Sequence, residues 1–275
     1  MSDNTEQAEF WNGRMGQAWA KAEAQIDRIL APLSDEAVSR MAAVSGEKVI
    51  DIGCGGGGTS LALTASGASI WGVDISQKMI ECARQKVGSN EHLAFSVGDA
   101  AAESFSPEYQ AVFSRFGVMF FADPISAFSN IRTALVPGGR MAFLCWQTPA
   151  ENPWISLAAS ALQPFQADAP TPDPRAPGPF AFADPDYLRE VLTAAGFGNI
   201  GIESVARQLH LGDSVAEAMT FQSQIGPLSR LLAELDDEAG KRATQAVVEA
   251  LTPHCTDTGI DLGAATWLVT ATNPD

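Results

Sequence analysis

A glycine-rich segment is the part of this sequence best suited to hold a ligand. It runs from Val49 to Gly58, with the sequence VIDIGCGGGG, and lies between a short apolar run and a helical pattern. Glycine lets the backbone adopt positive φ angles and lets a ligand come close to it. The N-terminus of the following helix offers unpaired N–H groups to polar parts of that ligand. By itself, such a turn does not tell apart the nucleotide-type cofactors that use it.

Three acidic residues indicate which kind of ligand this glycine-rich segment could bind. Asp51, Asp74 and Asp99 each stand at or just after the end of a short run that is predicted to form a strand, the first of them buried. Because the carboxyl ends of parallel strands meet at one edge of a sheet, we expect the three carboxylates to lie along that edge. A carboxylate there can accept both hydroxyls of an adenosine ribose. Another can accept the exocyclic amine of adenine.

The elements that would position these acids alternate between strand and helix. We expect strands at 48–52, 69–74, 93–97, 111–114 and 141–146, with a sharp turn at 137–139 before the last. Helices are expected at 59–66, from a Ser76 cap to residue 87, and at 124–135, and this alternation predicts a parallel sheet with helices on both faces. Later we expect a helix at 185–196, strands at 199–211 and 264–272, and helices over 214–252 broken near Gly226-Pro227 and Gly240.

The chain divides into four segments within one structural domain. Residues 1–45 are predicted to form an N-terminal helical lid, with Ser34 and Asp35 capping its last helix, and 46–148 the cofactor-binding core. Residues 149–198 form a cap segment rich in proline and aromatic residues, which we expect to be ordered. Residues 199–275 contain the last strands with an inserted helical segment.

Charge and composition exclude several classes of function. The net charge is −16, so nucleic acids and anionic membranes are repelled, and no run of Lys or Arg offsets this. The four cysteines form no CxxC pair or Cys/His cluster, so neither a metal site nor a disulfide framework is expected. The polar, acidic N-terminus is not a signal peptide, and no membrane helix is present. We therefore expect a cytoplasmic protein.

The motifs resemble those of class I S-adenosylmethionine-dependent methyltransferases. The segments DIGCGGG, GVDIS, GDA and LVPGGR are similar to those of the ubiquinone and menaquinone C-methyltransferases, and the resemblance covers about residues 44–146. It implies a Rossmann-like, mostly parallel sheet of seven strands whose last strand is antiparallel. It also implies S-adenosylmethionine as methyl donor and S-adenosylhomocysteine as product.

The same resemblance assigns roles to individual residues. Glycines 53, 55 and 57 would line the methionine part of the cofactor, and Asp51 would orient that part. Asp74 would hold the ribose, with Ile75 against the adenine, while Asp99 and Ala100 would read the adenine edge. Ser114 and Arg115 match the place where the family lines the sulfonium and the substrate. Ser114-Arg115-Phe116 is not the NPPY motif of amino-group methyltransferases, which disfavours DNA-amine chemistry.

Candidates for substrate binding and catalysis are less sharply defined. An apolar wall suits an uncharged or aromatic acceptor, and the wall candidates are Trp11, Trp19, Phe116, Phe120, Trp146 and Phe180. Arg115 can hold a carboxylate of the cofactor or substrate, or pair with a structural acid. Of the three histidines, His210 is the one that we would test as a general base, although a structural or surface role is favoured for each.

Two other functions compete with methyl transfer to a small molecule. An NAD(P)-dependent oxidoreductase would use the same glycine turn, but neither Tyr109 nor Tyr187 is followed by lysine four residues later. A non-catalytic module could bind S-adenosylmethionine without a closed substrate cavity; the aromatic segment after Trp146 argues against it. The acceptor, the methylated atom (C, O, N or S) and the oligomeric state, a homodimer included, stay open.

Overall fold

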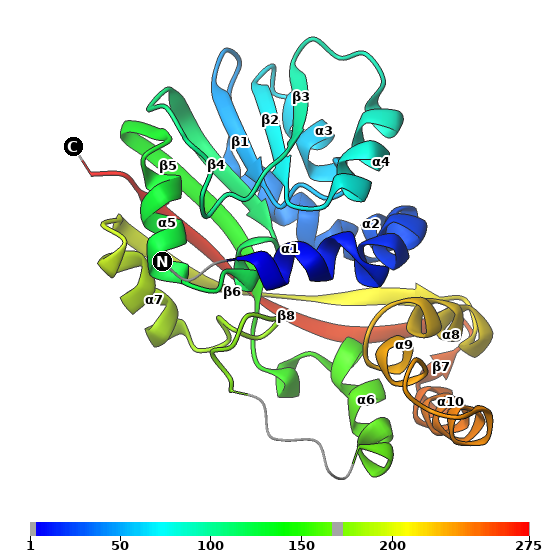
Figure 1. The fold of residues 1–275 in the computed structure, drawn as a ribbon. Helices are drawn as coiled ribbons and strands as arrows, with labels where there is room; N and C mark the ends of the chain where they lie inside the picture. Colours follow the sequence, from blue (N-terminus) through cyan, green and yellow to red (C-terminus); the bar gives the residue numbers. More distant parts are fainter. Residues whose placement is uncertain (1–3, 167–172, 275) are drawn as a thin grey trace.

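The computed structural model describes residues 4–166 and 173–274, which form a three-layer α/β arrangement around one open sheet (Figure 1). The strand order is β3-β2-β1-β4-β5-β8-β6, with β7 paired to β8. All pairs from β3 to β5 are parallel, and β8 is antiparallel to both of its neighbours. The strands are β1 (Lys48–Ile52), β2 (Ser69–Asp74), β3 (Leu93–Val97), β4 (Tyr109–Arg115), β5 (Leu135–Trp146), β6 (Gly198–Gly212), β7 (Cys255–Thr256) and β8 (Gly259–Thr272).

The helices fall into three groups. The helices are α1 (Thr5–Asn12), α2 (Arg14–Met41), α3 (Gly58–Thr64), α4 (Gln77–Val87), α5 (Pro124–Arg132), α6 (Pro153–Leu162), α7 (Pro185–Ala194), α8 (Val215–Gln224), α9 (Pro227–Leu231) and α10 (Asp237–Leu251). One group is α2 with α3 and α4, which it contacts, and a second is α5 with α7, which lie against each other. Right-handed crossovers require this separation, since the strand order reverses between β1 and β4 and the connecting helices therefore lie on opposite faces. The third group is α6 with α8 to α10.

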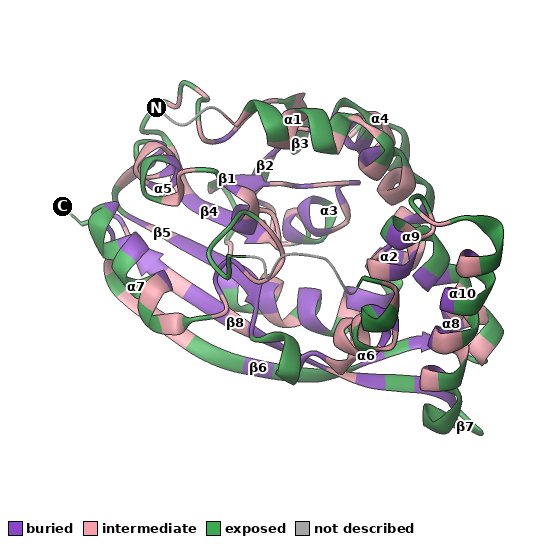
Figure 2. Ribbon diagram, turned by 60° about the horizontal axis from the view of Figure 1, so that its bottom comes forward, coloured by how far each residue is buried: buried purple, intermediate pink, exposed green. Residues whose placement is uncertain are grey.

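The central strands of the sheet are among the most buried parts of the molecule. All residues of β1 except Lys48 are buried, as are the last six residues of β5 (Figure 2). A strand covered by helices on both faces has no polar side to alternate with, so it reads as a continuous apolar run. The edge strand β6 shows the opposite behaviour, with many exposed residues along its length. The Rossmann-like fold and the antiparallel strand predicted from the sequence are confirmed.

Strands β6 and β8 extend past the rest of the sheet. Their pairing continues from Gly198↔Thr272 to Gly212↔Ile260, whereas β5 pairs with β8 only over residues 266–272. The overhang reaches the third helix group, where α6 contacts β8 and α8 contacts both long strands (Figure 1). β8 begins at Gly259 and not at the predicted residue 264. Its first residues are held by pairing with β6 in the overhang and not by burial in the centre of the sheet.

Several local predictions were wrong, and each has an identifiable cause. Ser34 and Asp35 do not cap a helix, because α2 continues through them, and the Ser34 hydroxyl donates to the Leu30 carbonyl at 3.0 Å. Gly240 lies inside α10, which Asp236 caps instead by accepting the Ala239 N–H at 2.8 Å. Helix α6 and the two-residue β7 were not predicted. Prolines 170 and 172 of the predicted ordered loop lie outside the described residues.

The turn expected at 137–139 is a bulge inside β5. Gly138 donates its N–H to the Asn273 carbonyl, and Asn273 donates its own to the Gly139 carbonyl, at 2.9 and 2.8 Å. The Asn273 side-chain amide also donates to the carbonyls of Leu135 and Val136, at 3.0 and 3.2 Å. A residue near the C-terminus thus keeps the glycine pair within the strand. The β4–β5 register shifts at this point.

Within the described residues, every helix is too short or too polar to cross a bilayer.

Candidate active site

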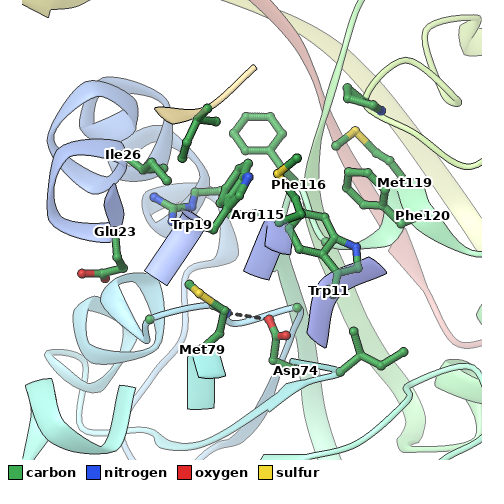
Figure 3. Close-up of a pocket in the computed structure, with 18 of the residues that line it drawn as sticks. Trp11, Trp19, Glu23, Ile26, Asp74, Met79, Arg115, Phe116, Met119 and Phe120 are labelled. Atoms are coloured by element: carbon green, nitrogen blue, oxygen red, sulfur yellow. Dashed lines mark hydrogen bonds between the residues drawn. The ribbon is translucent and has the colours of Figure 1, made fainter. Parts of the chain in front are cut away.

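A mainly apolar cavity opens at the carboxyl ends of β1, β2, β4 and β5 (Figure 3). The N-terminal helices α1 and α2 cover one side of it, and residues of α6, α8 and α9 close another. This position is the point at which the strand order reverses, where open α/β sheets bind their ligands. The cavity has two chemically different ends, which we call the strand-end site (Gly53, Gly55, Asp74, Ile75, Asp99 and Ala100) and the aromatic site (Phe116, Phe121, Trp146, Trp154, Phe221 and Ile225).

The glycine turn after β1 is held in a conformation that only glycine adopts without strain. Gly53 has φ +65°, and a Cβ atom added there would lie 2.7 Å from the Gly117 Cα. The loops that follow β1 and β4 therefore touch, backbone to backbone, at the reversal point. At Gly55, with φ +54°, an added Cβ would meet only the Met79 methyl at 3.4 Å. The backbone is thus left open to a ligand on the Gly55 side.

Asp74 is oriented by two backbone N–H groups. One carboxylate oxygen, at the dashed line in Figure 3, accepts from Gly55 at 2.9 Å, and the other accepts from Ser76 at 2.8 Å. Each oxygen keeps a further lone pair, so the carboxylate can accept two more hydrogen bonds from a ligand. Burial raises the pKa of Asp74 above its ordinary value, and the two N–H donors oppose that shift. Ile75 beside it presents an apolar surface to the same space.

Asp99, the third strand-end carboxylate, is hydrogen-bonded to the N-terminal segment. Asp99 accepts from the Asn4 side-chain amide at 3.0 Å and from the Ala101 N–H at 2.9 Å, both on the same oxygen. Gln7 of α1 also lines the cavity, and its Oε1 is buried with no hydrogen-bond partner among the described residues. A buried polar atom without a partner is uncommon. The strand-end site therefore offers both a carboxylate and an unsatisfied amide to a polar ring edge.

Asp51 lies behind the glycine turn and not in the lining of the cavity. It is fully buried, and its Oδ2 accepts from Thr59 at 2.9 Å and Ser60 at 2.6 Å, while its Oδ1 has no partner. Burial raises its pKa from 3.8 to about 6. Ser114 is also absent from the lining. Its hydroxyl donates to the Ile52 carbonyl at 2.7 Å and accepts from Gly117 at 3.2 Å, which ties the two loops together.

A charged cluster on α2 borders the glycine turn. Asp27 accepts from Arg115 at 2.8 Å and from Lys86 at 2.8 Å, and Lys86 also donates to Glu23. Burial tends to raise the pKa of Asp27, but Arg115 and Lys86 outweigh it and lower the pKa; burial and the adjacent Asp27 raise that of Glu23. Arg115 also donates to Ser34 at 3.0 Å. Its guanidinium is thus largely committed to α2.

The aromatic site is built on a strained residue. Phe116 has φ +62°, a conformation that costs a non-glycine residue about 1–2 kcal/mol. Its ring stacks on Trp146 with centroids 4.0 Å apart and planes within 5°, and Trp146 contacts Trp154 at 4.9 Å. The left-handed backbone turns the Phe116 ring toward β5. The stacking of this ring on Trp146, which forms a flat aromatic wall, offsets the backbone strain. Such strain is typical of functional sites.

Helix α1 is fastened across the strand-end site. Asn12 donates to the Ile75 carbonyl and accepts from the Gln77 N–H, each at 2.9 Å, and the Ser76 hydroxyl donates to the Trp11 carbonyl at 2.9 Å. The Trp11 ring lies edge-on to Trp19 and to Phe120, with centroids 5.5 and 5.2 Å apart (Figure 3). No residue of α1 is buried, so these polar contacts and rings hold it in place.

Most of the residues predicted for the site line this one cavity. They are Gly53, Gly55, Asp74, Ile75, Asp99, Ala100, Arg115, Trp11, Trp19, Phe116, Phe120 and Trp146. Asp51, Gly57, Ser114 and Phe180 lie outside the lining, and at Gly57 an added Cβ would meet the Phe95 ring at 2.7 Å. His210 is exposed near the end of β6, paired with Asp261 and Asp213 at 3.0 Å each, so its ring is directed at the surface.

Apart from Trp11 and Trp19, the sequence analysis missed the lining residues that come from helices, and it also missed Asn4, which precedes α1. The missed helix residues include Gln7, Glu23, Asp27, Met79, Gln222 and Arg230. Glu23 and Asp27 are four residues apart and thus on one helix face, together with Trp19, which is the one sequence signal that could have indicated them. Residues of α8 and α9 carry no such signal. Among the described lining residues there is no histidine, cysteine, tyrosine or lysine.

Part of the chain is similar in sequence to known methyltransferases. Residues 50–143 match the profile of a family described as "Methyltransferase domain". The chain is 28% identical over 170 residues to demethylmenaquinone methyltransferase of Clavibacter sepedonicus, covering 58% of this chain and 69% of that protein. It is 32% identical over 117 residues to a ubiquinone biosynthesis O-methyltransferase of Aromatoleum aromaticum, covering 41% and 49%.

Solved structures agree at the level of the fold. Phosphoethanolamine N-methyltransferase 2 of Haemonchus contortus, in complex with phosphomonomethylethanolamine and S-adenosylhomocysteine, aligns with a TM-score of 0.61 and 17% identity. The alignment covers 100% of this chain and 61% of that one. The chain thus spans about half of the ubiquinone enzyme and under two thirds of the nematode enzyme. The matched profile includes β1 to most of β5, the part that carries the glycine turn and all three strand-end acids.

Proposed function

We propose that this chain is a class I S-adenosylmethionine-dependent methyltransferase, since residues 50–143 match a family described as "Methyltransferase domain", and that it methylates a small molecule with a flat, largely apolar body. The observation that carries the proposal is the single cavity in which strand-end carboxylates and an aromatic wall face a common space. A covering of N-terminal and C-terminal helices over that space favours an enzyme over a module that only binds the cofactor. The aromatic wall suits ring-shaped acceptors.

The residues of the strand-end site fit an adenosyl group. Asp74 has two free acceptor positions for the ribose hydroxyls, and Ile75 and Ala100 supply apolar surfaces for the adenine. Asp99 keeps one oxygen without a hydrogen bond, and the Gln7 Oε1 is buried without a partner, so both can pair with the adenine edge. Asp51 acts indirectly in this proposal, by holding the start of α3 through Thr59 and Ser60.

The charged cluster on α2 is placed to receive the methionine part of the cofactor. Gly56 faces Glu23 so closely that an added Cβ would lie 2.3 Å from its carboxylate. Glu23 and Asp27 are negative, so they can pair with an ammonium group, whereas Arg115 is already bound to Asp27 and Ser34. We therefore assign Arg115 to positioning through Asp27 and not to proton transfer.

S-adenosylmethionine supplies a methyl group that is already activated on a sulfonium. The residues of this chain then have to orient the acceptor, hold it close and exclude water, and alignment alone can lower a barrier by about 7–11 kcal/mol. Phe116, Trp146 and Trp154 provide one wall for the acceptor, and Trp11 closes the cavity from α1. Since the described lining holds no histidine, we propose that the acceptor atom arrives already nucleophilic.

The relatives make an aromatic acceptor reasonable. Two of them are named for steps in menaquinone and ubiquinone formation, and another, from Streptomyces, is an aklanonic acid methyltransferase with 29% identity over 137 residues. A ring of this kind is flat and apolar, which is the shape that the Phe116–Trp146 stack extends. The methylated atom stays open.

Two measurements test the proposal. Calorimetry with S-adenosylhomocysteine and with NADH should show micromolar binding of the first and none of the second. Transfer of radiolabelled methyl groups from S-adenosylmethionine into a bacterial metabolite extract should then label a small, solvent-extractable compound. Binding of NADH in place of S-adenosylhomocysteine would contradict the proposal. Cofactor binding without any labelled product would favour the non-catalytic module.

A further inference from the structure

Arg230 is a positively charged side chain in the lining of the cavity that has no charged partner. It comes from the short helix α9 and faces the same space as the aromatic site. Its guanidinium carbon lies 5.9 Å from the centre of the Phe10 ring, at the outer limit of a cation–π contact. In the described part of the chain, its side chain makes no hydrogen bond or ion pair with any residue.

The surroundings make this unpaired charge unusual. The chain has 33 acidic residues and only 17 lysines and arginines, so carboxylates are plentiful. Arg115, in the same cavity, is bound to Asp27 and Ser34, and Arg28 on α2 pairs with Glu217 on α8. Burial lowers the pKa of Arg230, with no neighbouring carboxylate to oppose the shift. A guanidinium nevertheless stays protonated in proteins, so a partly desolvated cation borders the cavity.

The position of Arg230 divides the cavity by charge. Asp74, Asp99, Glu23 and Asp27 all belong to the strand-end site and the charged cluster on α2. The lining residues contributed by α6, α8 and α9 are apolar or neutral apart from Arg230. Gln222, which is buried on α8, donates to the Trp154 carbonyl at 3.4 Å and so links this wall to α6. On the other side, Arg115 is already paired with Asp27, so a negatively charged ligand group is attracted mainly to the α9 side.

We propose that the acceptor is an aromatic or otherwise flat apolar molecule that carries a carboxylate or phosphate group, and that Arg230 binds this group. A planar guanidinium can donate two parallel hydrogen bonds to such an anion. The anion fixes one end of the acceptor at α9 while the Phe116–Trp146 wall holds its ring. This inference rests on the proposed function and adds the charge of the acceptor to it.

The test compares two probes of the same shape and different charge. Naphthalene-2-carboxylate and naphthalene-2-carboxamide are titrated into protein saturated with S-adenosylhomocysteine, and binding is followed by quenching of tryptophan fluorescence. We expect the carboxylate to bind at least 10-fold more tightly than the carboxamide. 2-Naphthyl phosphate in a third titration decides between the two anion types, and tight binding of either anion supports the proposal.

Three variants assign the effect to one side chain. Arg230→Gln should remove the preference for the anion, and Arg230→Lys should retain part of it, while both keep the carboxamide affinity. Arg242→Gln, an exposed arginine of α10 outside the lining and without an ion pair, is the control and should behave as the wild type. Thermal unfolding of each variant checks that the fold is intact.

Two results would overturn the inference. One is equal binding of the charged and uncharged probes, or binding of neither, by the protein loaded with S-adenosylhomocysteine. The other is a preference for the anion that survives in Arg230→Gln. Failure of the wild-type protein to bind S-adenosylhomocysteine at all would instead contradict the proposed function, and calorimetry measures this before any probe is added.

Discussion

The two ends of the cavity are assembled in different ways. The strand-end site is made of residues that lie at, or within three positions after, the ends of β1, β2 and β3. The aromatic site joins Phe116 and Phe121 after β4, Trp146 at the end of β5, Trp154 on α6, Phe221 on α8 and Ile225 just after α8. The first is local and repeats one rule, that strand ends meet at one edge. The second depends on how distant helices pack.

The two ends of the cavity therefore differ in how firmly the core of the sheet fixes their residues. A ligand that binds the strand-end site meets groups fixed by the core, because β1 and β2 are largely buried. The aromatic site lies under helices carried by the overhanging ends of β6 and β8, which the sheet centre does not hold. Acceptor specificity can therefore change while the cofactor end stays the same. Four predictions test this separation.

The largest effect is expected at the strand-end site. Asp74→Ala should weaken S-adenosylhomocysteine binding by about 100-fold or more, because two hydrogen bonds to a charged group are lost, each worth about 1.5–3 kcal/mol. Calorimetry measures this, and binding of naphthalene-2-carboxamide should change little. Asp257→Ala, an exposed aspartate in a remote turn, is the control. An unchanged affinity in Asp74→Ala would remove Asp74 from the ribose site.

The buried acid behind the same site should respond to pH. Because the pKa of Asp51 is raised to about 6 in the folded protein, from 3.8, its contribution to stability is full below about pH 4 and is lost as the pH rises through 6. Asp51→Asn lacks this dependence. The free energy of unfolding of the variant relative to wild type should therefore increase between pH 4 and pH 7, by up to about 3 kcal/mol. Urea denaturation of the ligand-free proteins measures it, and a constant difference would refute the burial argument.

A pair of substitutions separates strain from stacking at the aromatic site. Phe116→Ala and Phe116→Gly both remove the ring that stacks on Trp146, but only glycine relieves the positive φ. We expect the glycine variant to be more stable than the alanine variant by about 1 kcal/mol. Both should bind naphthalene-2-carboxamide several-fold more weakly and S-adenosylhomocysteine as the wild type does. Weaker cofactor binding in both would show that the two ends are not separable.

The smallest effect is expected where α1 covers the strand-end site. Asn12→Ala removes the contacts with Ile75 and Gln77, which are exposed and worth about 0.5 kcal/mol each. The release of S-adenosylhomocysteine should become about fivefold faster in stopped-flow fluorescence, with little change in the melting temperature. Asn90→Ala, a surface asparagine far from α1 in the fold, should release the ligand at the wild-type rate. An unchanged rate in Asn12→Ala would show that α1 does not limit release.

Local sequence signals determined much of the fold and one end of the site. The run Val49 to Ile52 and its glycines predicted β1 and the turn, because a strand buried on both faces must be apolar throughout. Ser76 was recognised as a helix cap, and its side chain accepts an N–H of the helix that follows it. The strand ends placed Asp74 and Asp99 together for the same topological reason.

Tertiary contacts decided the rest. Ser34 resembles a cap in the sequence but lies inside α2, where it bonds to Leu30 and Arg115, and the glycines at 138 and 139 stay in β5 because Asn273 pairs with them. No pattern places Arg230 beside the aromatic wall. That juxtaposition depends on the packing of helices far apart in the chain, and packing follows from shape and burial summed over many residues, which no short segment encodes.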